Sequence, residues 1–192
     1  MKLFGTTTSP FVRRVRVVAA EVGEPIDRVD TATDAGQAAL REVTPIRKVP
    51  VAIVEGRTLF DSRAIIDWLV ERRGWGELAR RDRWDELDRV NAIDAALDAV
   101  IQLYYLRRDG VAIDGTPYAQ RQLDRAAAIF AWLDARAPFG DGLAVAEISL
   151  VAALDWMDFR STYPTERAGA NVLAVRARWR DRPSLATTRP HA

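Results

Sequence analysis

The chain has 192 residues, of which 48% are hydrophobic and 29% charged; this composition is typical of a globular protein and excludes a disordered or fibrous one. A formal net charge of +1 argues against nucleic acid as a partner, because proteins that neutralise many phosphates carry a basic excess. The sequence has no cysteine and one histidine, His191, so disulfides, zinc fingers and cysteine nucleophiles are excluded and no metal site is expected.

The sequence gives no sign of a membrane segment or an export signal. Apolar runs such as residues 65–70 are interrupted by charges well before the roughly 18 residues that a spanning helix needs. The N-terminal stretch MKLFGTTTSPF has no apolar signal core. We therefore expect no membrane partner and a cytoplasmic location.

The first seventy or so residues alternate between strand and helix patterns. After an apolar strand at residues 2–4, Ser9 followed by Pro10 is typical of an N-cap and first turn, and apolar spacing up to Val22 predicts a helix that ends at Gly23. The next predicted elements are a strand over 27–30, a helix over 35–42, a hairpin of 51–54 with 58–60, and a helix over 62–73.

The pattern changes at Gly74, after which we find no convincing strand. Residues 74–82 are polar and rich in arginine, which favours a linker. Helices are predicted over about 83–108, 117–137, 145–159 and 171–180. The sequence thus predicts an α/β domain over residues 1–73, a linker over 74–82 and an all-helical domain over 83–192.

Ser9 lies where a strand gives way to a helix, and the pattern allows two roles. It can cap the helix, or its hydroxyl can face a cleft in which the positive end of the helix dipole favours an anion. Thr6, Thr7 and Thr8 are neighbouring hydroxyls that could share the second role. A serine hydrolase is disfavoured because His191, near the end of the sequence, is not expected to hold a base in place.

Three motifs carry a resemblance to a known family. SPFVRRV at 9–15, KVPV at 48–51 and FDSRAI at 60–65 resemble, in order and spacing, the N-terminal domain of the cytosolic glutathione transferases. The resemblance covers essentially the whole chain, and the Ser-Pro-Phe start is similar to the serine-type classes and to small bacterial members. It implies a thioredoxin-like βαβαββα domain followed by an all-α domain, and a homodimer.

The resemblance also implies an activity. Ser9 would hold the glutathione thiol as a thiolate, which attacks small hydrophobic electrophiles in a detoxification reaction with glutathione as co-substrate. No tyrosine precedes Tyr104, so the chain does not resemble the tyrosine-type classes in mechanism. The alternative is a non-catalytic glutathione-binding or protein-interaction module that keeps the fold without turnover.

The glutathione-binding residues follow from the same resemblance. It implies a cis bond before Pro50, which lets the backbone of Val49 pair with the cysteinyl part of glutathione, and it implies that Ser62 binds the γ-glutamyl carboxylate and Asp61 the amine. From the residues alone we would predict no cis bond but a simple strand-edge proline at Pro50, and a plain helix cap at Asp61 and Ser62. Lys48 and the arginines of the first helix are candidates for the glycyl carboxylate, although we expect most of those arginines to be solvated.

Two further expectations concern the second half. We place the second-substrate pocket, from position alone, at Thr7, Phe11, Tyr104, Tyr105 and Arg108. The helix that begins near residue 145 has Ala144 and Glu147 where family members often carry a capping serine or threonine and an aspartate. Alanine cannot cap, so we expect this helix to lack about 1 kcal/mol of local support, although Glu147 can still reach back to a backbone amide.

Overall fold

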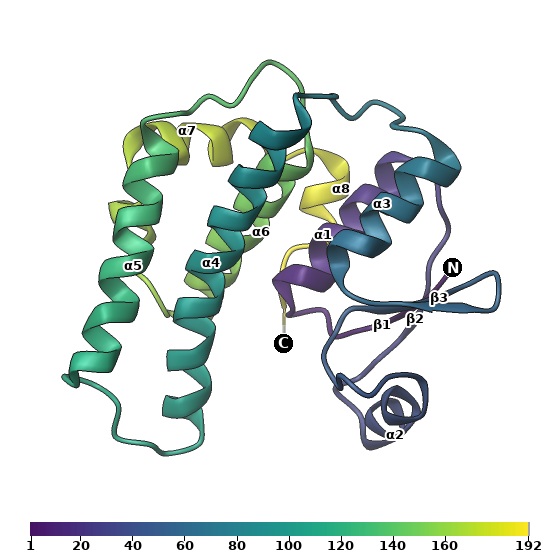
Figure 1. Cartoon of the computed structure of the whole chain (residues 1–192), viewed down its shortest axis with the longest axis horizontal. Helices are drawn as coiled ribbons and strands as arrows, with labels where there is room; N and C mark the ends of the chain where they lie inside the picture. The colour runs from purple at the N-terminus through teal and green to yellow at the C-terminus, as the bar shows by residue number, and fades with distance from the viewer. Residues whose placement is uncertain (192) are drawn as a thin grey trace. The chain divides into compact units, whose positions relative to one another are not determined.

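The computed structural model describes residues 1–191, which form two compact units (Figure 1). The N-terminal unit comprises Met1–Arg80 together with the residues from Arg182 onward, and the helical unit comprises Arg81–Asp181. Every strand of the described residues lies in the first unit, as the sequence predicts.

A four-stranded mixed sheet forms the centre of the N-terminal unit. Its strands lie in the order β2-β1-β3-β4, with β1 parallel to β2 and the other neighbours antiparallel. Glu55 and Gly56 between β3 and β4 have φ of 49° and 75°, which suits a two-residue hairpin turn that needs positive φ at both positions. The strands are β1 (Lys2–Phe4), β2 (Asp27–Val29), β3 (Val51–Val54) and β4 (Arg57–Leu59).

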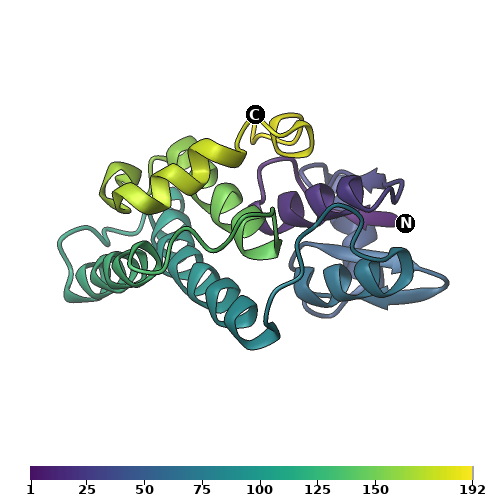
Figure 2. The ribbon, with the colours of Figure 1, turned by 90° about the horizontal axis from the view of Figure 1, so that it is seen from above.

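Helices cover both faces of this sheet. Helices α1 (Pro10–Glu21) and α3 (Ser62–Arg73) pack against each other on one face, and α2 (Asp34–Val43) lies on the other (Figures 1 and 2). Leu40 of α2 packs with Phe4 and Val51 in a buried cluster. The element order and the sheet confirm the expected thioredoxin-like domain.

The C-terminal residues differ from the expected domain boundaries. Helix α8 (Pro183–Ala186) packs on α1 within the N-terminal unit, whereas the sequence analysis assigned residues up to 192 to the helical domain. The buried Arg13 donates from Nη2 to the carbonyl of Leu185 at 3.0 Å, and Arg182 pairs with Glu21 at 2.6 Å. These polar contacts, which no apolar pattern signals, join the segment to α1.

The predicted linker is partly packed. Leu78 is 4% exposed, and a Cβ atom on Gly76 would lie 2.6 Å from the carbonyl oxygen of Glu21. This close approach to the end of α1 explains why a glycine with positive φ stands here. The residues up to Arg80 therefore belong to the N-terminal unit.

The helical unit is built around α6 (Val145–Arg160), which is buried from Val145 to Met157. A helix that is apolar around most of its circumference is typical of a central position. Helix α6 packs against the long helix α4, which in turn packs against α5 (Figure 1). The other elements of the unit are α4 (Arg83–Arg108), α5 (Pro117–Asp134), the 3₁₀ helix η1 (Thr165–Arg167) and α7 (Ala170–Trp179).

The start of α6 is better supported than the sequence analysis expects. Ala144 has no capping side chain, but Glu86 of α4 accepts the Ala146 N–H at 2.7 Å, and Glu147 accepts the Ala144 N–H at 3.0 Å. Arg81 pairs with Glu147 at 2.6 Å. The expected contact of Glu147 is confirmed, and the expected deficit is corrected because Glu86 supplies a second acceptor that the sequence did not indicate.

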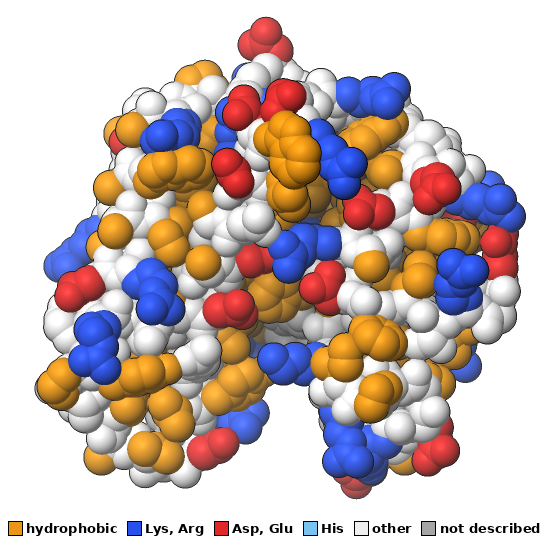
Figure 3. All heavy atoms as spheres, viewed as in Figure 1, with side chains coloured by type: hydrophobic (Ala, Val, Ile, Leu, Met, Phe, Trp, Pro, Cys, Tyr) orange, Lys and Arg blue, Asp and Glu red, His pale blue; other side chains and the backbone are white. Residues whose placement is uncertain are grey.

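The surface carries charges of both signs. Figure 3 shows basic and acidic side chains interspersed with apolar ones over the visible face of each unit, in keeping with a net charge of +1. Within residues 1–191, no helix combines the length and the apolar character needed to cross a membrane.

Candidate functional site

Ser9 begins α1 and its side chain caps the helix. The residue has extended backbone angles, and its Oγ accepts the Val12 N–H at 3.3 Å, while Pro10 occupies the first helical position. The cap bond uses a lone pair of the hydroxyl and leaves its proton available for another acceptor. The capping interpretation is thus confirmed, and it leaves room for the catalytic one, which stays a prediction.

The three threonines before Ser9 have hydroxyl partners within the N-terminal unit. The hydroxyls of Thr6 and Thr8 lie 3.2 Å apart, and Thr7 donates to the carbonyl of His191 at 3.3 Å. The exposed imidazole of His191 faces its own segment, with Nδ1 3.0 Å from the carbonyl oxygen of Arg189. Contact between this residue and the threonine loop is through its main chain.

The segment before β3 contains three predicted glutathione contacts. The Val49–Pro50 bond is cis, as the resemblance implies; Pro50 is buried and Lys48 is exposed. The side chain of Val49 packs against the cluster of Phe4 and Leu40. Among the described residues, none hydrogen-bonds to the backbone N–H or C=O of Val49, so both groups remain available to a ligand.

Asp61 and Ser62 form the start of α3, and their side chains differ sharply in exposure. The Asp61 carboxylate is 61% exposed and accepts the Arg63 N–H at 2.8 Å as the N-cap. Ser62 is 1% exposed, and its Oγ accepts two hydrogen bonds from Arg14, at 3.0 Å from Nε and 2.7 Å from Nη2. The structure therefore links the predicted γ-glutamyl site to an arginine of α1.

The arginines of α1 are less solvated than the sequence analysis expects. Arg13 and Arg14 are 1% and 2% exposed, with Arg13 directed to the C-terminal segment and Arg14 to Ser62. Arg14 has apolar neighbours at i−3 and i+4, Phe11 and Val18, and this spacing could have marked it as buried. Neither arginine is placed as a surface partner for the glycyl carboxylate.

Positive charge is concentrated on this helix. Partial burial, together with the neighbouring Arg28 and Arg13, lowers the pKa of Arg16 from its ordinary value.

The residues expected to contact a second substrate fall in both units. Thr7 is half-buried, and the ring of Phe11 lies 5.1 Å from the Arg14 guanidinium. In α4, Tyr104 packs edge-on against Trp156, and Arg108 lies 4.7 Å from the ring of the exposed Tyr105. Their grouping into one pocket stays a prediction.

Comparison with known proteins identifies the N-terminal unit. Residues 3–77, which span β1 to α3, match the family model of the glutathione S-transferase N-terminal domain. The uncharacterized GST-like protein YibF of Escherichia coli is 30% identical over 102 residues, which cover 53% of this chain and 50% of that protein. The match thus spans about half the length of this curated relative.

The whole chain resembles solved structures. A glutathione transferase family member from Pseudomonas fluorescens Pf-5, with bound glutathione, is 27% identical with a TM-score of 0.85, covering 100% of this chain and 99% of that one. Residues 3–77 thus match a glutathione S-transferase N-terminal domain, and the whole chain is similar to a glutathione transferase family member. A glutathione S-transferase from Methylobacillus flagellatus KT with GSH bound shares the fold at 24% identity and a TM-score of 0.86, with 99% of each chain covered.

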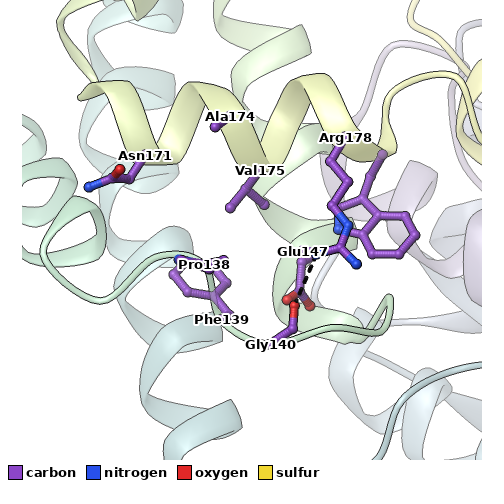
Figure 4. A pocket seen from close by; sticks show the side chains of 9 residues that line it. Pro138, Phe139, Gly140, Glu147, Asn171, Ala174, Val175 and Arg178 are labelled. Carbon is purple, nitrogen blue, oxygen red and sulfur yellow. Dashed lines mark hydrogen bonds between the residues drawn. The ribbon is translucent and has the colours of Figure 1, made fainter.

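The helical unit contains a separate cavity of about 160 Å³ (Figure 4). It lies between the segment 138–140 and α7, with Glu147 and Arg178 at one end and Asn171 at the other (Figure 4). None of the residues predicted for glutathione or the second substrate lines this cavity. The cavity therefore lies apart from the residues predicted for glutathione and the second substrate.

Proposed function

We propose that the chain is a glutathione transferase in which Ser9 donates a hydrogen bond to the sulfur of bound glutathione. The observation that carries the proposal is that Ser9 caps α1 through its lone pair and keeps its proton available at the positive end of the helix. Support comes from the family of residues 3–77 and from the relative of Pseudomonas fluorescens that binds glutathione.

In this proposal the peptide is held by the elements that surround Ser9. The free backbone groups of Val49 beside Pro50 pair with the cysteinyl part as an added strand would. Ser62 receives the γ-glutamyl carboxylate at the start of α3, and the exposed Asp61 receives the amine. Lys48, also exposed, is the candidate for the glycyl carboxylate.

The second substrate is a small hydrophobic electrophile, whose conjugation detoxifies it. We keep Thr7, Phe11, Tyr104, Tyr105 and Arg108 as the residues that contact it. We also propose that the protein acts in the cytoplasm as a homodimer, as its resemblance to the cytosolic transferases suggests.

Ionisation of the thiol is the chemical step in which Ser9 takes part. A free thiol with a pKa of about 8.5 is only a few per cent ionised at neutral pH, and lowering the pKa by about two units requires roughly 2.7 kcal/mol. A hydrogen bond to a charged group supplies about 1.5–3 kcal/mol and a helix N-terminus about 0.3–1 kcal/mol. The thiol proton leaves to solvent, and the sulfur then bonds to the electrophilic carbon as its leaving group departs with the bonding electrons.

Substitution of Ser9 tests this role. Ser9→Ala should lower turnover about ten- to a hundredfold while the affinity for glutathione changes far less, because Val49 and Ser62 hold the peptide. Ser9→Thr should keep part of the activity, since the hydroxyl remains. Steady-state kinetics with a chromogenic electrophile and calorimetry of glutathione binding measure the two quantities.

Ser9→Ala also removes a helix cap, so it needs a matched control. Thr116 caps α5 in the helical unit by accepting the Ala119 N–H at 3.2 Å, and Thr116→Ala should cost a similar stability of about 1 kcal/mol without lowering turnover. Alanine at Thr6 or Thr8 should leave turnover near that of the parent. Full turnover in Ser9→Ala with its loss in a threonine variant would show that the catalytic hydroxyl is misassigned.

A non-catalytic glutathione-binding or interaction module is the second candidate. The observation that favours it is the cap bond from Val12 to Ser9, which accounts for a serine at this position without any chemistry. In that case the parent would bind glutathione tightly and leave the thiol protonated. Turnover with an electrophile and the affinity for glutathione, measured on the same protein, therefore distinguish the enzyme from the binding module.

A further inference from the structure

Four aromatic side chains and one arginine lie together where α4 packs against α6 in the helical unit (Figure 1). Tyr104 of α4 meets Trp156 of α6 edge-on, with ring centroids 5.6 Å apart, and Tyr105 lies 5.5 Å from Tyr104. Trp156 and Arg160 are four residues apart and so share one face of α6. The guanidinium carbon of Arg160 lies 5.3 Å from the centre of the Tyr104 ring and 4.6 Å from that of Phe159. We call these five residues the aromatic–arginine cluster.

The positive charge of Arg160 is left unpaired by the described part of the chain. Within residues 1–191, no carboxylate forms an ion pair with its guanidinium, and its Nε atom is buried without a hydrogen-bond partner. Asp158, two residues earlier, is held by Arg176 at 2.6 Å, and the other cation near the tyrosines, Arg108, is paired with Asp109 at 2.8 Å. Contact with an aromatic face stabilises a cation but does not neutralise it. The cluster therefore keeps a charge that a bound anion can use.

The two tyrosines offer an apolar surface and further hydrogen-bonding groups. Tyr104 is half-buried and Tyr105 is 49% exposed, and neither hydroxyl has a hydrogen-bond partner among the described residues. Aromatic rings favour offset or edge-to-face contact with another flat ring, and a guanidinium favours a carboxylate that can accept two N–H groups. The ligand that satisfies both parts of the cluster is a small aromatic molecule with an anionic group.

We propose that the aromatic–arginine cluster binds a small aromatic anion, and that Arg160 is the residue that selects the charge. The ring of the ligand packs on Tyr104 and Tyr105, and its anionic group bonds to Arg160. A second part of the inference rests on the proposed function: this ligand is the second substrate, because both tyrosines belong to the set expected to contact it. The class of electrophile is thereby narrowed to aromatic compounds that carry a carboxylate or a similar anion. The competing interpretation is that Arg160 only packs against the rings.

Two ligands of nearly equal shape separate these interpretations by binding alone. Calorimetry compares para-nitrobenzoate with para-nitrobenzamide, which lacks the charge. The parent should bind the benzoate at least about tenfold more tightly. Arg160→Met keeps an apolar side chain over the rings and removes the charge, so it should weaken binding of the benzoate about tenfold and of the benzamide less than about threefold. Equal weakening of both ligands, or of neither, would overturn the inference.

Arg136 provides the matched control in the same unit. Its guanidinium lies 4.0 Å from the ring of Trp132, and neither residue belongs to the sets predicted to contact glutathione or the second substrate. Arg136→Met removes one positive charge and one arginine–aromatic contact, and it should keep the parent's preference for the benzoate. Arg160→Lys returns the charge without the paired donors and should restore part of that preference. If thermal melting shows that Arg160→Met does not fold, Arg160→Gln decides, because it also removes the charge.

Turnover tests whether the bound anion is the second substrate. The probes are a benzoate and a benzamide that each carry a chlorine para to the charged or neutral group and a nitro group next to the chlorine. In both, the sulfur of glutathione bonds to the carbon that bears the chlorine, and chloride leaves with the bonding electrons. Once divided by the rate without protein, kcat/KM of the parent should be at least about tenfold higher for the benzoate, and Arg160→Met should abolish this preference.

The binding and turnover results distinguish the two proposals. Selective binding of para-nitrobenzoate without turnover of either probe would support the anion site and contradict the proposed function. Turnover of both probes without preference, unchanged in Arg160→Met, would overturn the inference and leave the proposed function standing.

Discussion

The hydroxyl of Ser9 can serve two purposes at once. Its lone pair holds the Val12 N–H at the start of α1, and its proton remains for the sulfur of glutathione. A helix N-terminus with a capping serine is thus already oriented for an anion, because the cap fixes the oxygen beside the exposed amides. Capping and catalysis are compatible roles of one side chain, and only a measurement on the thiol separates them.

Glu86 is a partly buried carboxylate, with a side chain 17% exposed, that supports the start of α6. Burial raises the pKa of Glu86 from its ordinary value and outweighs the hydrogen bond from the Ala146 N–H and the charge of Arg81, which both lower it. Burial likewise raises the pKa of Glu147. A carboxyl pKa that is higher in the folded state means that folding takes up a proton. The stability that this protonation contributes is present below the unfolded pKa and is lost as pH rises through the folded pKa.

Glu86→Gln should therefore lower the free energy of unfolding most at acidic pH. The amide oxygen can still accept the Ala146 N–H but does not titrate, so the deficit of the variant relative to the parent should shrink from about pH 4.5 to about pH 8. Urea denaturation at the two pH values measures the free energies of unfolding. A deficit that grows with pH would contradict the account.

Ala144→Ser is the control for the same helix start. The sequence alone predicts that a new cap would add about 1 kcal/mol, but Glu86 and Glu147 already accept the amides of Ala146 and Ala144. We now expect a change within about 0.5 kcal/mol.

At the level of single residues, the sequence predicts some positions of the site and misses others. The place of Ser9 at a helix start was predictable because a serine followed by proline and by regularly spaced apolar residues is typical of an N-cap. The cis bond between Val49 and Pro50 was predictable because the resemblance of the motif implied it, and the structure contains it. The burial of Arg14 was not predicted, because a run of three arginines within four positions is normally solvated. Its partner Ser62 is 48 residues away, and no local pattern records that distance.

At the scale of elements, α1 connects the parts of the N-terminal unit. Ser9 caps its N-terminus by accepting the Val12 N–H, Arg14 donates to Ser62 of α3, and Arg13 donates to the carbonyl of Leu185 in the C-terminal segment. Helix α1 therefore couples the proposed thiol site to the γ-glutamyl site through one rigid element.

The end of α1 is joined to the C-terminal segment by an ion pair. Arg182 donates to both carboxylate oxygens of Glu21, at 2.7 and 2.6 Å, and this bond is the main cause that lowers the pKa of Glu21 from its ordinary value. A lowered carboxyl pKa adds stability above the unfolded pKa, which is lost as pH falls through the folded one.

Glu21→Gln should lower the free energy of unfolding by about 1.5–3 kcal/mol near neutral pH, and the loss should fade below about pH 4.5. Glu77 offers a matched control, since it pairs with the same Arg182 at 2.8 Å but is 82% exposed. Glu77→Gln should cost less than about 1 kcal/mol. Urea denaturation over this pH range checks both, and equal losses would contradict the role of burial.

Most elements were predictable because their apolar residues recur with the period of a strand or a helix. The helix over residues 83–108 has the predicted bounds, and α5, α6 and α7 begin within a residue or so of theirs. The short helix α8 was missed because four residues give no periodicity. Its place in the N-terminal unit depends on Arg13 and Arg182, and such long-range polar contacts leave no trace in local sequence.

At the scale of the whole molecule, the fold is shown, the N-terminal domain matches a known family, and the chemistry is proposed. Residues 3–77 match the family's N-terminal domain, and a glutathione-bound relative matches the whole chain at 27% identity. A fold can host more than one activity, so the central claim depends on the state of the thiol rather than on the likeness.

The most direct test is an ultraviolet titration of glutathione bound to the parent protein, in which the absorbance of the thiolate is followed against pH. The account predicts that the bound thiol titrates near about pH 6.5, roughly two units below a free thiol, and that Ser9→Ala raises this value by about one to two units. A bound thiol that still titrates near about 8.5 in the parent would contradict the account.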